Sequence, residues 1–202
     1  MHEFDTGSAR RWAEEIHRKL LEEGDIAIDA TMGNGYDTLR LCRLVGDSGK
    51  VYAFDIQEEA IEATRGLLER EGLAGRAILI HAGHQDMKEY VKEEANLAVF
   101  NLGWLPGARH AVTTLADTTL PAVQACLELL KPGGMLTVCV YPGHEEGARE
   151  RDLLITWAKR LDPLRYDCVI HAYLNQPGDP PLLIAVRKAE KSRKMKRPAR
   201  ML

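Results

Sequence analysis

Residues 29–38 read Asp29-Ala30-Thr31-Met32-Gly33-Asn34-Gly35-Tyr36-Asp37-Thr38. This stretch follows the short apolar run Ile26-Ala27-Ile28 and leads into apolar residues at helical spacing. Glycine tolerates the backbone angles of a tight turn, and its missing Cβ lets a ligand approach the main chain. A strand that ends in an acidic residue before such a turn is typical of α/β proteins, in which ligands bind beyond the carboxyl ends of the strands.

Outward from this turn, strand and helix patterns alternate along the chain. Short apolar runs predict strands at residues 26–28, 51–54, 77–80, 97–100 and 135–141. Helical spacing predicts helices at residues 8–23 (with Trp12 on the apolar face), 38–45, 58–71, 87–94, 120–130 and 148–161. Lys131-Pro132-Gly133-Gly134 is interpreted as a helix stop.

The last part of the chain breaks the alternation. Residues 166–174 and 182–186 are two β-type runs joined only by a Pro- and Gly-rich turn, so they form an antiparallel hairpin. The predicted fold is therefore α/β and Rossmann-like, with a seven-stranded, mostly parallel sheet and a C-terminal antiparallel hairpin.

The turn at residues 29–38 resembles the acidic-x-Gly-x-Gly-x-Gly motif of enzymes that use S-adenosylmethionine (SAM), with Thr31 in place of the first glycine. Asp55 ends the second predicted strand, where a carboxylate can accept hydrogen bonds from both ribose hydroxyls. NAD is the alternative cofactor, but its GxGxxG fingerprint is not met; a tight turn without a ligand is the third interpretation. SAM is favoured, and with it the class I methyltransferase fold. The residues predicted to bind it here are Asp29, Thr31, Gly33, Asn34, Gly35, Asp37, Thr38, Asp55 and Gln57.

A polar loop, Gly83-His84-Gln85-Asp86-Met87, follows the third predicted strand. In this fold the loop borders the adenine, and His84, Gln85 or Asp86 can meet its exocyclic amino group. Capping of the following helix explains Asp86 equally well. His84 and Gln85 are therefore the predicted adenine contacts.

The reaction centre is predicted in residues 101–107, which follow the fourth strand and read Asn101-Leu102-Gly103-Trp104-Leu105-Pro106-Gly107. This loop loosely resembles the [Asn/Asp]-Pro-Pro-[aromatic] motif of amino-group methyltransferases. Asn101 can accept a hydrogen bond from a substrate amine and can also contact the cofactor. Trp104 can stack on a base or enclose the sulfonium; ordinary packing is its alternative role.

Cysteine and histidine positions narrow the chemistry. The four cysteines, Cys42, Cys126, Cys139 and Cys168, form no CxxC pair and are predicted to be buried free thiols, not a metal site. None lies in the loop after the fourth strand, which disfavours methylation of a pyrimidine ring carbon and favours a nitrogen or oxygen acceptor. His144 is a candidate proton acceptor, although shaping of its turn is the stronger interpretation.

Charge divides the chain unequally. Residues 187–202 hold eight basic residues and one acidic residue, a net charge of +7, whereas the other 186 residues hold 19 basic and 29 acidic residues, or −10. Such a tail suits a polyanion such as RNA, and a solvated tail without a partner is the equal alternative. We expect a methyltransferase domain at residues 1–188 and a basic tail at residues 189–202. With no apolar run near the ~20 residues of a membrane span and no signal-peptide core, we expect a cytoplasmic protein without membrane contact.

Taken together, residues 29–38 and 101–107, Thr113-Thr114, residues 141–144, and Asn175-Gln176 with Pro180-Pro181 resemble the MnmM-type (YtqB-like) methyltransferases, also described as rRNA methylases. The resemblance covers about residues 8–188. It implies SAM-dependent methylation of a tRNA wobble uridine, position 34, within the anticodon stem-loop. The acceptor it implies is the amine of 5-aminomethyl-2-thiouridine, which becomes the 5-methylaminomethyl form.

Two departures from that family bear on the site. Trp104 stands where the family usually has tyrosine, so a hydroxyl role is lost, and residues 107–110 differ from its usual Gly-Gly-Asp-Lys. Methylation of rRNA or of a small molecule is kept as an alternative function, and a non-catalytic SAM-binding protein that associates with RNA as a weaker one. A homodimer is the assembly we consider.

Overall fold

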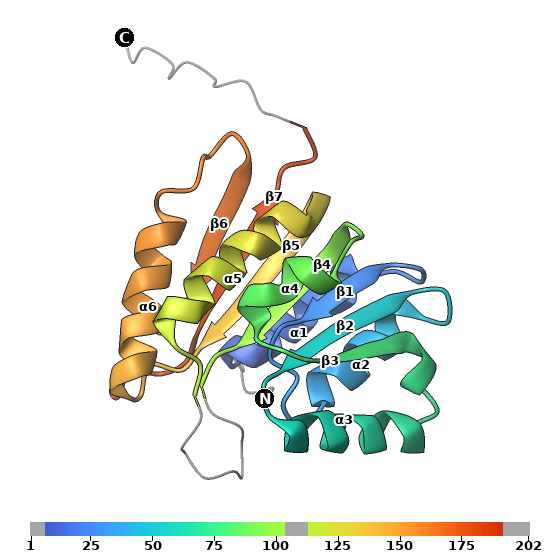
Figure 1. The fold of residues 1–202 in the computed structure, drawn as a ribbon. Coiled ribbons are helices and arrows are strands. Elements are labelled where there is room, and N and C mark those ends of the chain that lie inside the picture. The colour runs from blue at the N-terminus through green and yellow to red at the C-terminus, as the bar shows by residue number, and fades with distance from the viewer. Residues whose placement is uncertain (1–6, 104–112, 192–202) are drawn as a thin grey trace, which may run out of the picture.

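The computed structural model describes residues 7–103 and 113–191, and within them seven strands form one sheet (Figure 1). The strands are β1 (Ile26–Asp29), β2 (Lys50–Asp55), β3 (Ala77–His81), β4 (Ala95–Asn101), β5 (Leu130–Val140), β6 (Tyr166–His171) and β7 (Leu182–Lys188). Their order across the sheet is β3-β2-β1-β4-β5-β7-β6. All neighbouring pairs are parallel except the two made by β7, which runs antiparallel to β5 and β6. The predicted mostly parallel sheet with a terminal hairpin is confirmed.

Helices cover both faces of this sheet (Figure 1). They are α1 (Ala9–Leu20), α2 (Tyr36–Val45), α3 (Glu58–Arg70), α4 (Met87–Tyr90), α5 (Ala116–Leu129) and α6 (Glu145–Ala158), with short 3-10 turns η1 (Ala74–Arg76) and η2 (His84–Asp86).

Alternate strand residues divide the core into two layers. Ile28 and Phe100 pack with α4, α5 and α6, while Ala27 and Leu97 pack with α2 and α3. Helix α1 covers the second face further along, where its first two turns meet β5 and β7. The carboxyl ends of β1, β2 and β4 thus lie side by side at one edge of the sheet.

The fifth strand begins earlier than predicted. Residues 131–134, interpreted as a helix stop, belong to β5, which pairs with β4 across a register shift between Ala95 and Leu97. Gly134 makes this approach feasible, because a Cβ there would lie 3.0 Å from the carbonyl oxygens of Asn96 and Lys131. The prediction that the strand starts at residue 135 was therefore wrong.

Helix boundaries also differ at several ends. Helix α1 ends at Leu20, not at residue 23, and Trp12 is 45% exposed with its ring 4.9 Å from that of His171. The helix predicted at residues 87–94 is a single turn, α4, and the one predicted from residue 120 starts at Ala116. Helix α6 starts three residues earlier than predicted because His144 caps it.

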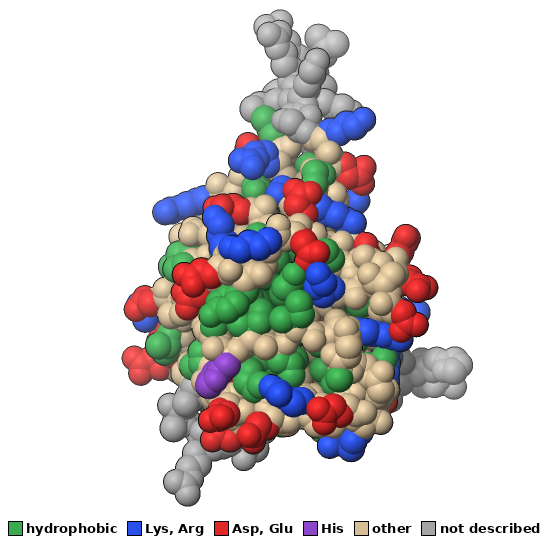
Figure 2. Space-filling model, turned by 45° about the vertical axis from the view of Figure 1, so that its right-hand side comes forward, with side chains coloured by type: hydrophobic (Ala, Val, Ile, Leu, Met, Phe, Trp, Pro, Cys, Tyr) green, Lys and Arg blue, Asp and Glu red, His purple; other side chains and the backbone are tan. Residues whose placement is uncertain are grey.

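The surface gives further outcomes. Cys42, Cys126 and Cys139 are buried free thiols as predicted, whereas Cys168 on β6 is exposed, so the prediction was wrong for that residue. Figure 2 shows basic and acidic side chains intermixed around a central apolar area on one face. Among the described helices, none has the length and apolar character to cross a membrane.

Candidate active site

A cavity of about 670 Å³ opens where β1, β2 and β4 end. Ten of the predicted site residues line it: Thr31, Gly33, Asn34, Asp37, Asp55, Gln57, His84, Gln85, Asn101 and His144. Asp29, Gly35 and Thr38 do not line it, and Trp104 lies outside the described residues, as does the basic tail from residue 192 on. Five separate segments of the chain therefore meet at one cavity.

The glycine turn is shaped by close packing against α3. Gly35 adopts φ 82°, and a Cβ there would lie 2.7 Å from Oγ1 and 2.9 Å from Cα of Thr64. The Thr64 hydroxyl donates to the Gly33 carbonyl at 3.0 Å. Any larger residue at position 35 would push α3 away, so this glycine builds the turn and does not itself face the cavity.

Asp29 supports the turn from beneath. Its side chain is fully buried and accepts hydrogen bonds from the Thr38 hydroxyl at 2.6 Å and the Thr31 amide at 3.2 Å. Burial raises the pKa of Asp29 to about 6, although both hydrogen bonds favour the ionised form. Asp29 and Thr38 therefore fix the geometry of the turn, which presents Gly33 and Asn34 to the cavity.

Asp55 stands at the cavity wall in a fixed orientation. One carboxylate oxygen accepts from the Gly33 amide and the other from the Gln57 amide, each at 3.0 Å. Each carboxylate oxygen has a second lone pair. Asp55 can therefore accept further hydrogen bonds from a diol in the cavity without moving.

His84 presents a buried acceptor. Its Nδ1 lies 3.3 Å from the Ala30 carbonyl, which can only accept, so the ring proton resides on Nδ1 and Nε2 carries a lone pair. Burial lowers the pKa of His84, which keeps the ring neutral. Nε2 is buried without a hydrogen-bond partner among the described residues. A ligand that donates an N–H, such as an exocyclic amine, would satisfy it.

The two residues after His84 behave differently. Asp86 occupies the N-cap position of α4, but its side chain makes no capping hydrogen bond, so the capping explanation was wrong. Its carboxylate instead accepts from the Gln85 side chain at 3.0 Å on the exposed rim.

Asn101 is held at the end of β4 by two contacts. The backbone N–H of Asn101 donates to the Thr31 hydroxyl at 2.8 Å, and the side-chain Nδ2 donates to the Asp37 carboxylate at 3.0 Å. The second bond assigns Nδ2 and Oδ1, so the side chain offers the carbonyl oxygen Oδ1 as an acceptor. This is the polarity needed to bind a substrate amine.

A buried carboxylate that the sequence analysis missed, Glu150, holds Thr114 where it pairs with Gly103, just after β4. Gly103 and Thr114 exchange two hydrogen bonds, from the Gly103 amide to the Thr114 hydroxyl at 2.8 Å and from the Thr114 amide to the Gly103 carbonyl at 3.1 Å. The Thr114 hydroxyl donates to Glu150 at 2.9 Å, and Thr119 donates to its other oxygen at 2.6 Å. Glu150 is 1% exposed, and burial raises its pKa. The only sequence signal was its position four residues before the buried Leu154, on the apolar face of α6.

His144 borders the cavity as the N-cap of α6. Its Nδ1 accepts a hydrogen bond from the Gly147 amide at 3.1 Å. In the neutral ring the proton is then on Nε2, and Nδ1 is occupied by the helix cap. The geometry agrees with the turn-shaping interpretation of His144.

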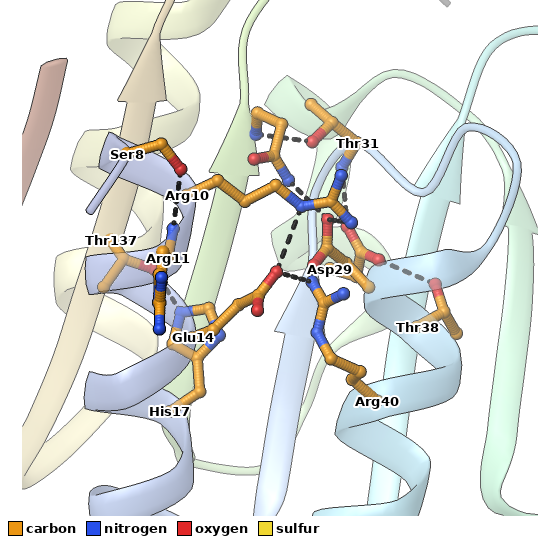
Figure 3. A network of polar contacts seen from close by, with 12 residues as sticks. Ser8, Arg10, Arg11, Glu14, His17, Asp29, Thr31, Thr38, Arg40 and Thr137 are labelled. Carbon is orange, nitrogen blue, oxygen red and sulfur yellow. Dashed lines mark hydrogen bonds and ion pairs between the residues drawn. The ribbon is translucent and has the colours of Figure 1, made fainter. Parts of the chain in front are cut away.

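Helix α1 brings a second missed residue to the cavity, Arg10. Figure 3 shows Arg10 reaching from α1 toward the turn that carries Thr31, within a network that includes Glu14 and Arg40. Arg40 forms ion pairs with Glu14 and with Asp37. Nothing in the sequence places helix α1 over the end of β4, so Arg10 could not be predicted as a cavity residue. Among the described residues, no cluster of His, Cys, Asp and Glu side chains could hold a metal ion.

Comparison with known proteins identifies the relatives of this chain. A family model described as "Putative rRNA methylase" matches residues 51–187. The chain is 36% identical over 195 residues to the "tRNA (mnm(5)s(2)U34)-methyltransferase, chloroplastic" of Arabidopsis thaliana, across 92% of this chain and 71% of that protein.

Two solved structures are also similar. A crystal structure described as a "putative rRNA-methylase" from Clostridium thermocellum has a TM-score of 0.90 and 34% identity, over 92% of this chain and 100% of that one. A "putative methyltransferase" from Streptococcus mutans in complex with SAH has a TM-score of 0.84 and 38% identity, over 91% and 99%. These matches confirm the predicted methyltransferase fold. The chain belongs to the rRNA-methylase family whose model it matches.

Proposed function

We propose that this protein is a SAM-dependent methyltransferase that acts on tRNA and N-methylates the 5-aminomethyl group of 5-aminomethyl-2-thiouridine at wobble position 34. The observation that carries the proposal is the cavity wall formed by Asp55, Gly33 and Asn101 at the ends of three adjacent strands. The name of the Arabidopsis thaliana relative, an mnm(5)s(2)U34 methyltransferase, supports the choice of substrate.

The cavity residues fit SAM. Nε2 of His84 can accept the exocyclic amine of adenine, and the Asp55 carboxylate can accept both ribose hydroxyls. Thr31, Gly33 and Asn34 provide a turn that a ligand can approach closely. When bound, SAM supplies an electrophilic methyl group on its sulfonium.

The acceptor side of the cavity fits an amine. Asn101 can orient the amine through Oδ1, and in-line transfer to nitrogen requires mainly orientation of a neutral amine. The described cavity lining contains no cysteine. Burial raises the pKa of Cys42 and Cys139 to about 12, which disfavours the thiolates that ring-carbon methylation would need. Nitrogen is thus the acceptor we propose, and Trp104 the residue that stacks on the base.

The anticodon stem-loop as binding region and a homodimer as assembly are part of the proposal. Support for a second copy comes from β6 at the edge of the sheet, where Val169 is 62% and Ile170 51% exposed. Light scattering of the purified protein tests the dimer. Ribosomal RNA is the second candidate substrate, because the family model is described as an rRNA methylase.

Nucleoside mass spectrometry of tRNA from a deletion strain tests the function. We expect the 5-aminomethyl-2-thiouridine form to accumulate and the methylated form to disappear, and purified protein with SAM should reverse this. If the tRNA nucleosides are unchanged and rRNA loses a methyl group, the substrate is rRNA and not tRNA. If neither RNA changes, and purified protein methylates neither, the proposal is wrong.

A further inference from the structure

Arg10 occupies a defined place at the cavity. Ser8 caps α1 by accepting a hydrogen bond from the Arg11 amide at 3.2 Å, which sets Arg10 in the first helical turn. From there Arg10 lines the cavity, whereas Arg11 and Arg18 of the same helix do not. Helix α1 therefore delivers one of these three arginines to the ligand space (Figure 3).

The strand order locates Arg10 relative to the cofactor. Asp55 and His84 follow β2 and β3, on one side of β1, while Asn101 follows β4, on the other side. Arg10 lies on the β4 side, with Nη2 4.0 Å from an Asp37 oxygen that also accepts from Asn101. A cofactor with its adenine at His84 and its ribose at Asp55 must extend its amino-acid moiety toward this side.

The contacts of Arg10 leave its guanidinium able to bind an anion. Its Nε lies 3.2 Å from Glu14, and the 4.0 Å ion pair with Asp37 is longer than a hydrogen bond. A guanidinium has five N–H donors in a planar fork that matches a carboxylate. The charge of Asp37 is already neutralised by its ion pair with Arg40. Glu14 thus holds Nε of Arg10, while the Nη donors of Arg10 reach the cavity.

We propose that Arg10 binds the α-carboxylate of the cofactor's amino-acid moiety. This inference rests on SAM as the cofactor, which belongs to the proposed function. It assigns helix α1 to the cofactor site, in addition to the strand ends that the motif indicates.

Calorimetric titration with SAM and with decarboxylated SAM, which lacks only the carboxylate, tests the assignment. For Arg10→Met we expect the affinity for SAM to fall about tenfold or more, and the affinity for decarboxylated SAM to stay within twofold of wild type. Arg10→Lys, which keeps the charge and loses the fork, should give an intermediate loss. Arg18→Met, on the same helix outside the cavity, is the matched control and should change neither.

The outcomes separate this inference from the proposed function. Equal losses for both ligands, or no loss for either, would overturn the carboxylate assignment. Loss of tRNA affinity without loss of SAM affinity would place an RNA phosphate at Arg10 instead. A wild-type protein that binds neither ligand would overturn SAM itself.

Discussion

Asp55 accepts a hydrogen bond from the backbone amide of Gly33 at 3.0 Å, so a single carboxylate ties the end of β2 to the turn after β1. The same group faces the cavity in which we place the ribose. Cofactor binding and the shape of the glycine turn are therefore coupled through one side chain.

Substitution of Asp55 tests this coupling. Asp55→Ala removes the ribose acceptor and the partner of Gly33, and we expect SAM affinity to fall ~10–100-fold, as for the loss of a charge-assisted hydrogen bond of ~1.5–3 kcal/mol. Calorimetry on the folded variant measures it. Asp47→Ala, which removes an exposed carboxylate paired with Arg76, is the control. Unchanged SAM affinity in folded Asp55→Ala would refute the ribose assignment.

Asn101→Ala should separate binding from turnover. Because Oδ1 is assigned to the substrate amine, we expect SAM affinity within a few-fold of wild type and a single-turnover rate about 100-fold lower, the order expected for a misplaced reactant. Rapid-quench measurements with saturating tRNA and labelled SAM give both values. A wild-type rate would mean that Asn101 only joins Thr31 and Asp37.

The predictable part of the site follows from local pattern. Asp29, Asp55 and Asn101 each end an apolar run, and parallel strands bring such ends to the same edge of a sheet. Their side-chain roles were less accessible. Asp29 and Gly35 belong to the motif but do not line the cavity. The sequence could not show this, because the packing of α3 on the turn is a contact between distant segments that spacing does not reveal.

Residues missed by the sequence analysis depend on how helices sit on the sheet. Arg10 and Glu150 act from α1 and α6, and neither helix has a motif that indicates its neighbours. A glutamate on an apolar helix face does not fit the helical pattern. Its burial is explained only by the hydroxyl groups of Thr114 and Thr119, which donate hydrogen bonds to it. The predicted start of β5 was wrong for another reason, because Pro and Gly ordinarily end helices and strands.

Glu150→Gln tests how Glu150 anchors the paired residues Thr114 and Gly103. The amide keeps the size of the side chain but loses the charge that accepts two hydroxyl donors, so we expect a loss of about 1–3 kcal/mol in unfolding free energy. The chemical rate should fall while SAM affinity is retained, because Gly103 adjoins the acceptor side of the cavity. Denaturant unfolding and single-turnover assays measure both. Exposed Glu145→Gln is the control, and equal behaviour of the two variants would contradict the anchoring role.

His17 predicts a specific acid sensitivity. Its Nε2 lies 2.8 Å from the Thr137 hydroxyl, and burial lowers its pKa from 6.5 to about 3. Below pH 6.5 the unfolded chain therefore binds a proton that the folded chain does not, so stability is complete above that pH and declines as the pH falls toward 3. At pH 5 linkage gives a loss of about 2 kcal/mol.

Denaturant unfolding of wild type and His17→Gln between pH 8 and pH 5 measures this difference. Asp29, whose pKa rises from 3.8 to about 6 on folding, contributes the opposite slope between those two values in both proteins, so comparing them isolates His17. Parallel curves for wild type and His17→Gln would contradict the prediction.

The basic tail should contribute to RNA affinity and not to chemistry. A chain ending at Lys191 lacks five basic residues: Arg193, Lys194, Lys196, Arg197 and Arg200. We expect weaker tRNA binding and a shallower dependence of log Kd on log salt, because fewer counterions are released. A full-length variant with these five residues changed to Gln separates charge from chain length. Equal salt slopes for all three proteins would indicate a tail without RNA contact, and SAM affinity should not change in any.

Strand β7 is translated after the other described strands, yet it lies between β5 and β6. While Leu182–Lys188 is still inside the ribosome, one edge of β5 has no partner and β6 has no place in the sheet. The nascent chain consequently cannot complete this layer in order of synthesis, although domains often begin to fold from their N-terminal side. Lys188, whose ammonium donates to the carbonyls of Leu127 and Glu128 at the end of α5, closes the arrangement last. A ribosome that stalls before Leu182 would release a chain with an open β edge, which is a substrate for chaperones and proteases.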